Sequence, residues 1–204
     1  MEVLQWARDH DCPWESTTCG CAAKGGHLEV LRWAREHDCP WNGRTCSSAA
    51  YGGHLGVLQW AREHGCPWHA ESICAFAAAG GHLDVLQWLR EHGCSWHEGT
   101  CAAMGGHLDV VQWLRAQGCP WDEETCAVAA AGGHLEVLQW AREHDCPWDA
   151  GTCRASAVGG HLALLQWARE NGCPWDGRDK AFVRAIAAER GHQEMLTWLD
   201  ETGE

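Results

Sequence analysis

GGHLEVLQWAREHDCPWDAGTC, residues 132–153, is the stretch that decides how the rest of the sequence is interpreted. It places two histidines, His134 and His144, close to two cysteines, Cys146 and Cys153. Taken alone, these side chains would suit a zinc site or a thiol active site. Near-identical stretches begin at other glycine pairs along the chain, however, so this one is a single copy of a repeat.

The repeat runs through the whole chain. Histidines that follow a glycine mark its period, with successive spacings of 27, 28, 25, 27, 27 and 31 residues. They are His27, His54, His82, His107, His134, His161 and His192. Because a catalytic centre needs one constellation that differs from its surroundings, these copies indicate a scaffold. Function is therefore sought in the positions that break the period.

Composition excludes several classes of protein. The chain has 204 residues, of which 46% are hydrophobic, enough for a continuous core. Fifteen basic residues against 28 acidic ones give a formal charge of -13. An acidic surface without basic runs repels phosphate, so we expect neither nucleic acid nor membrane as a partner. The sequence shows no signal peptide and no membrane span, which predicts an intracellular, cytoplasmic protein.

Each repeat predicts two short helices. Over residues 134–144 the apolar side chains cover more than half of the helical circumference, so this helix should have neighbours on more than one side. These side chains are Leu135, Val137, Leu138, Trp140 and Ala141. The alanine-rich stretch at residues 125–131 predicts a shorter first helix that approaches its neighbours closely, and Pro147 stops the second helix.

The repeat resembles the ankyrin repeat family. The family's second-helix signature, Gly-His-Leu-Glu-Val-Val-Lys-Leu-Leu-Leu-Glu-x-Gly-Ala-Asp-Val-Asn, aligns without gaps on residues 133–149, and Ala129-Ala130 match its Ala-Ala pair. The resemblance covers the full chain. It implies an all-α, ankyrin-like helical-repeat solenoid, an α/α superhelix, in which the face made by first helices and loops commonly binds partner proteins.

Two departures from the family pattern change the expected structure. The family period is about 33 residues, and the residues missing here fall between Asp149 and Cys153, where the family has its hairpin finger. Reduced or absent β-hairpins are therefore expected. The Thr-Pro-Leu-His tetrapeptide is also lost, with Thr125, Cys126 and Ala127 in its place, which removes the usual hydrogen bonding at the start of the first helix.

Two tryptophan columns and one arginine column run through the repeats. The tryptophans are expected to be core residues that offset the lost hairpin packing, since each can bury roughly 200 Å². The arginines stand where the family has leucine, so their stems should pack while their heads reach carboxylates or tryptophan faces. A phosphate-binding ladder is the alternative, which the net acidity disfavours. The arginines are Arg8, Arg35, Arg62, Arg90, Arg115, Arg142 and Arg169.

The cysteines occupy repeated slots, so we interpret them as reduced core thiols. A zinc site would need a third ligand, yet the histidine of the His144 position becomes Gln117 and Asn171 in other repeats. No unique Cys–His–Asn set can be chosen for protease chemistry either. We therefore predict no catalytic residues, no cofactor and no metal.

The positions that break the period lie on first helices and loops. The candidate partner-binding residues are Lys24, Arg44, Ser47, Tyr51, His69, Met104, Glu123 and Arg154. Simple drift of exposed positions is the alternative explanation. The predicted function is a non-catalytic scaffold that binds a partner protein. A targeting module of a longer enzyme or adaptor is the competing hypothesis, and a zinc-binding repeat protein comes third.

The two ends and the middle of the array carry further expectations. The sequence predicts one array over residues 1–204, with a partial repeat at 1–14, six repeats at 15–176 and a polar capping repeat at 177–204. An uncapped apolar edge at residues 1–11 should mark a fragment of a longer array or associate with another molecule. Deletions near Cys101 predict a shortened first helix at residues 100–104 and a local change of curvature.

Overall fold

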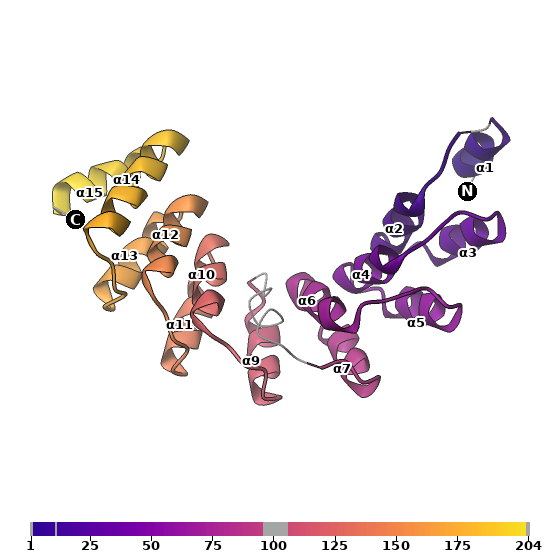
Figure 1. Cartoon of the computed structure of the whole chain (residues 1–204), viewed down its shortest axis with the longest axis horizontal. Coiled ribbons are helices and arrows are strands. Elements are labelled where there is room, and N and C mark those ends of the chain that lie inside the picture. The colour runs from indigo at the N-terminus through magenta and orange to yellow at the C-terminus, as the bar shows by residue number, and fades with distance from the viewer. Residues whose placement is uncertain (1, 11, 96–105, 203–204) are drawn as a thin grey trace. The chain divides into compact units, whose positions relative to one another are not determined.

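The computed structural model describes residues 2–10, 12–95 and 106–202. The chain divides into two compact units, residues 1–95 and 96–204, and each is described by itself. Throughout the described residues the regular structure is helical, with no strand (Figure 1). The prediction of an all-α helical-repeat solenoid with reduced or absent hairpins is therefore confirmed.

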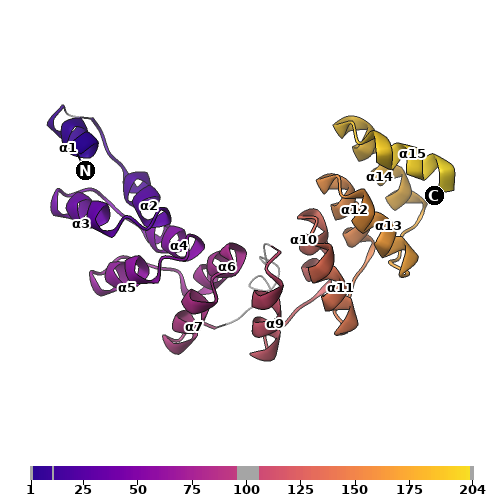
Figure 2. The ribbon, with the colours of Figure 1, turned by 180° about the vertical axis from the view of Figure 1, so that it is seen from behind.

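In the first unit, helix α1 (Glu2–Asp9) precedes the pairs α2 (Ser16–Lys24) with α3 (Leu28–Glu36), α4 (Gly43–Tyr51) with α5 (Leu55–Glu63), and α6 (Ala70–Gly80) with α7 (Leu83–Glu91). In the second unit, α9 (Leu108–Ala116) precedes the pairs α10 (Glu123–Ala131) with α11 (Leu135–Glu143), α12 (Ala150–Gly159) with α13 (Leu162–Glu170), and α14 (Gly177–Arg190) with α15 (Gln193–Thr202). Figure 2 shows the same helices from behind.

The first helices of each unit lie side by side, α2 with α4 and α6, and α10 with α12 and α14. Small side chains make this close approach possible. On α4, Cys46, Ala49 and Ala50 are fully buried, and the partner helix α5 adds Leu58 and Ala61. The core of a repeat is therefore a layer of alanine and cysteine on the first helix packed against the leucine of the second helix.

Asparagine or aspartate starts several of the first helices. The Asp122 carboxylate accepts hydrogen bonds from the backbone N–H groups of Glu124 and Thr125 at 3.1 and 3.3 Å. The Thr125 hydroxyl in turn accepts from the Asp122 N–H, which completes a capping box. Asp176 forms the same kind of capping box, and Asn42 and Asp149 each accept one backbone hydrogen bond at the start of their helices. Side-chain caps thus replace the lost tetrapeptide.

The Gly-Gly-His motif joins neighbouring repeats. The histidine Nε2 donates to the carbonyl oxygen of the residue that precedes the glycines of the previous repeat. These bonds join His54 to Lys24 at 3.0 Å, His82 to Tyr51 at 3.0 Å and His161 to Ala131 at 3.1 Å. Gly53 lies under the His82 ring with φ +73°, and a Cβ there would approach the ring to 2.4 Å. Only glycine satisfies both conditions.

The arginine column confirms one prediction and the tryptophan columns correct another. The Arg142 guanidinium lies over the Trp148 ring, 4.4 Å from the centroid, and donates to the Cys146 carbonyl. The same cation–π contact recurs in other repeats, so the arginine heads do reach tryptophan faces. None of the described tryptophans is fully buried, but Trp148, Trp167, Trp175 and Trp198 are partly buried and pack against the core of the second unit. Edge-on pairs such as Trp121 with Trp140 leave these rings half-buried or exposed at the surface.

The ends of the chain differ from its regular repeats. Helix α14 has 14 residues, against nine for α10, and Arg184 pairs with Asp200 of α15 at 2.7 Å. On α1, 79% of Val3 and 59% of Trp6 are exposed, as the sequence predicts for that edge. The shortened helix expected at residues 100–104 lies outside the described residues.

Candidate partner-binding surface

A groove of about 560 Å³ lies on the first-helix side of the first unit, between α2, α4 and α6. It gathers side chains that lie one repeat apart in the sequence. The residues that line this groove are Lys24, Arg44, Ser47, Ser48, Tyr51, Phe76 and Ala79. Four of the eight sequence-predicted candidates, Lys24, Arg44, Ser47 and Tyr51, are thus brought together. Phe76 and Ser48 were not among the predictions.

Two aromatic rings give the groove its apolar character. Tyr51 is 42% exposed and Phe76 is 44% exposed, whereas most large apolar side chains of the described residues are covered. The Lys24 ammonium lies 4.9 Å from the Tyr51 ring centroid. Ser47 is buried, and its hydroxyl donates to the Gly43 carbonyl at 3.2 Å. Exposed aromatic side chains of this kind are enriched at protein interfaces.

The charge of the groove is opposite to that of the chain. Its lining holds two cations, Lys24 and Arg44, and no carboxylate, although the whole chain carries a formal charge of -13. Outside the arginine column, residues 1–95 contain only one further basic residue, Arg32. Arg32 pairs with Glu29 on the second-helix side. Lys24 and Arg44, the lysine and arginine side chains carried by α2, α4 and α6, therefore both line the groove.

The scaffold fixes the backbone of the groove. Lys24 and Tyr51 are the last residues of α2 and α4, where helical carbonyls lack an intrahelical partner. His54 and His82 donate to these two carbonyls. Two side chains of the groove are thus held on backbone that is fixed by the repeated histidine hydrogen bond.

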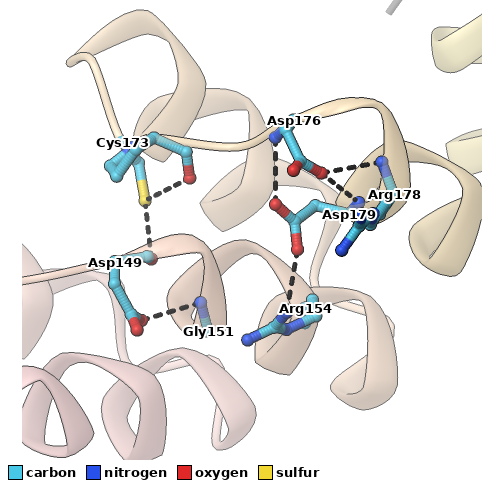
Figure 3. A network of polar contacts seen from close by, with 8 residues as sticks. Asp149, Gly151, Arg154, Cys173, Asp176, Arg178 and Asp179 are labelled. Atoms are coloured by element: carbon cyan, nitrogen blue, oxygen red, sulfur yellow. Dashed lines mark hydrogen bonds and ion pairs between the residues drawn. The ribbon is translucent and has the colours of Figure 1, made fainter.

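The other predicted candidates lie elsewhere. His69 precedes α6, and its ring lies against Gly43 at the start of α4. Glu123 is exposed in the first turn of α10. Arg154 donates to Asp179 at 2.8 Å, linking α12 to α14 beside two helix caps (Figure 3). Met104 lies outside the described residues. Of the described candidates, His69, Glu123 and Arg154 do not line the groove.

Hollows also occur between second helices, but they follow the repeat. One, of about 690 Å³, contains Arg35, Trp41 and Trp60. Another, of about 500 Å³, contains Arg142, Trp148 and Trp167, which are the equivalent residues of the second unit. Because the same slots form both hollows, they reflect the arginine–tryptophan framework. The first-helix groove is built from positions that differ between repeats.

The cysteines confirm the core interpretation with one correction. Of the cysteines described, Cys12 and Cys21 are exposed and the others are buried. Cys119 is disulfide-bonded, so the prediction of fully reduced thiols is wrong at this position. Among the described residues, no group of three or more His, Cys, Asp or Glu side chains is arranged to hold a metal ion.

These features define a helical-repeat protein with a groove on its first-helix face. Residues 73–115 match the family model for ankyrin repeats (many copies). The human ASB11 ankyrin repeat domain is a structural match with a TM-score of 0.56 and 17% sequence identity, covering 76% of this chain and 84% of that one. No curated protein matches the sequence. The sequence match over residues 73–115 and the shared fold show that the chain is similar to ankyrin repeat proteins.

Proposed function

We propose that the chain is a non-catalytic scaffold that binds a partner protein through the groove between α2, α4 and α6. The observation that carries the proposal is the convergence of Tyr51, Phe76 and two cations, all at positions that vary between repeats, on one accessible hollow. Ankyrin repeats are in general protein-interaction modules, which supports the same function.

The groove has the chemistry of recognition rather than of catalysis. The serine hydroxyls of the groove belong to Ser47 and Ser48, and no histidine or carboxylate lines the groove to activate either of them as a nucleophile. The Ser47 hydroxyl is already bonded to a backbone carbonyl. Apolar rings beside Lys24 and Arg44 would instead receive an apolar side chain flanked by a carboxylate. Such a partner would gain from burial and from charge complementarity.

An affinity pull-down with the array as bait tests the proposal. The variant Tyr51→Ala/Phe76→Ala should lose captured partners, because the removed rings supply most of the apolar area of the groove. The charge-reversal variant Lys24→Glu/Arg44→Glu should lose them as well. Phe182→Ala and Arg178→Glu are matched controls, since both side chains are exposed on α14 and neither lines the groove. Equal capture by groove and control variants would contradict the proposal.

The proposal also covers the cellular location of the chain and its association with other molecules. An intracellular location fits a chain in which none of the described helices is long and apolar enough to cross a membrane. Exposed Val3 and Trp6 support association through the α1 edge. The competing function, a targeting module within a longer enzyme or adaptor, uses the same groove, and identification of the captured partner distinguishes it from a free scaffold.

A further inference from the structure

Buried cysteines in this fold occur as thiol pairs. Each pair belongs to one repeat. One cysteine lies on the first helix, and its side chain contacts the cysteine that follows the second helix, which we call the loop cysteine. The two members lie 20 residues apart in the sequence. The pairs are Cys19–Cys39, Cys46–Cys66, Cys74–Cys94, Cys126–Cys146 and Cys153–Cys173. The capping repeat has no such pair, because Lys180 and Glu204 stand at the two positions where the other repeats have cysteine.

A second contact fixes the loop member of the pair. The Cys66 thiol lies 3.4 Å from the carbonyl oxygen of Asn42, the residue that caps α4. Cys173 makes the same contact with Asp149 at 3.2 Å (Figure 3). Both thiols of a repeat are therefore held near the start of its first helix, where the side chain of one hydrogen-bonds to the side chain of the other.

The two thiols of a pair are chemically unequal. Donation of a hydrogen bond to Cys66, together with burial, raises the pKa of the Cys46 thiol. The hydrogen bond received from Cys46, with a smaller contribution from Arg35, lowers the pKa of the Cys66 thiol. The pKa of Cys173 is lowered in the same way by Cys153 and then Arg169. In the Cys46–Cys66 and Cys153–Cys173 pairs the loop cysteine is thus the better nucleophile, and the first-helix cysteine stays protonated beside it.

We propose that these pairs are oxidation sites, at which a peroxide converts each dithiol into a disulfide that staples the first helix of a repeat to the loop after its second helix. The occurrence of a disulfide at Cys119, which occupies the same slot as Cys66, supports the assignment. The inference is independent of the proposed groove function, because none of these cysteines lines the groove.

The chemistry balances with one peroxide for each pair. The Cys66 thiolate attacks one peroxide oxygen, the O–O bond breaks, and the second oxygen leaves as hydroxide. This step gives Cys66 sulfenic acid. The Cys46 sulfur then attacks the Cys66 sulfur, the S–O bond breaks, and the Cys46 proton leaves with the departing oxygen as water. Two thiols are oxidised, one hydrogen peroxide is reduced to two waters, and the pair loses two hydrogen atoms.

The test is oxidation of the whole chain with hydrogen peroxide, followed by alkylation and mass spectrometry of its peptides. We expect cross-links within the same repeat, including Cys46–Cys66 and Cys153–Cys173, and a loss of two hydrogen atoms per pair. Because both thiols are buried, oxidation should become faster in low, non-denaturing urea, which promotes local opening. The urea midpoint of the oxidised chain should then be higher than that of the reduced chain.

Two variants keep the test decisive. Cys66→Ser should leave Cys46 open to alkylation while the Cys153–Cys173 link still forms, which also shows that the variant chain has folded. Cys21→Ser removes an exposed cysteine that belongs to none of these pairs and should leave every link intact. Links between different repeats or different molecules would overturn the proposal. Full alkylation of Cys46 and Cys66 after peroxide treatment would overturn it equally.

Discussion

The His82 Nε2 lies 3.0 Å from the carbonyl oxygen of Tyr51, the residue whose ring forms part of the groove. The same imidazole covers Gly53, so one side chain fixes both the end of α4 and the turn that follows it. His82 and Gly53 belong to the repeated motif, whereas Tyr51 stands at a position that varies between repeats, so the hydrogen bond joins the two. Partner binding and array stability should consequently share this residue.

Replacing His82 tests this connection. His82→Ala removes a hydrogen bond to a helix-terminal carbonyl and the packing over Gly53, so the free energy of unfolding should fall by about 1–2 kcal/mol. Capture of partners by the Tyr51 groove should weaken in parallel. His92→Ala is the control, because His92 is exposed and bonds only within its own repeat, to the Trp88 carbonyl. A similar loss in both variants, measured by urea unfolding, would show that the inter-repeat bond contributes nothing specific.

Substitutions at two glycines can distinguish the cost of backbone strain from the cost of a steric clash. Gly53 and Gly65 both have positive φ, +73° and +78°, but a Cβ at Gly65 would meet nothing within 4 Å. Gly65→Ala should therefore cost about 1 kcal/mol, the penalty of the left-handed conformation. Gly53→Ala adds a clash with the His82 ring and should cost about 1–3 kcal/mol more. Urea unfolding of the two variants checks the difference, and equal losses would refute the close approach seen here.

His134 predicts a pH dependence of stability. Burial, followed by the charges of His107 and His161, lowers its pKa below the ordinary value of 6.5. The unfolded chain therefore binds a proton at higher pH than the folded chain does. The contribution of neutral His134 is complete above pH 6.5 and is lost as the pH falls through the lowered folded-state pKa. His134→Gln should flatten this part of a stability profile measured from pH 7.5 to pH 5, and an unchanged slope would contradict it.

The sequence predicted the repeat, the helices and the buried alanine–cysteine layer because each follows from local periodicity. The burial of the tryptophans was overestimated, because their apolar character alone does not show how far each ring is covered. In three dimensions Trp140 reaches from the helix to the surface and meets Trp121 of the preceding loop at 5.9 Å between ring centroids. The extent of burial of so large a side chain depends on the spacing between repeats, which the pattern does not specify.

Part of the groove could be predicted because variation marked it. Lys24 and Tyr51 stand out at one slot, and Arg44 and Ser47 at two others. Phe76 was missed although its slot also varies, with Ser48 at the equivalent place in the preceding repeat. The sequence does not reveal that α2, α4 and α6 bring these slots to one hollow, because that depends on how closely the small side chains let the first helices pack.

Each arginine of the column can make two different contacts at once, a hydrogen bond and a cation–π contact, and a substitution tests whether both matter. Arg142 combines a bond to the Cys146 carbonyl with a position over the Trp148 ring. Arg142→Lys keeps the charge but cannot make both contacts with one ammonium group. Its free energy of unfolding should fall by about 1 kcal/mol. The exposed Arg178→Lys serves as control, and no difference between the two variants at either low or high salt would mean that charge alone matters.

The α1 edge provides a comparison between two valines at the same slot of the repeat. Val3 is 79% exposed, whereas Val57 of α5 is 4% exposed. Threonine has nearly the same shape as valine, so the substitution mainly adds a hydroxyl, which is costly only where it is buried. Val57→Thr should destabilise the chain by about 1–3 kcal/mol, while Val3→Thr should change its unfolding free energy by less than about 0.5 kcal/mol. If the edge also mediates association, Val3→Thr should lower the apparent mass in sedimentation at high protein concentration. A loss of stability at Val3 as large as that at Val57 would show that this edge is covered in the folded chain in solution.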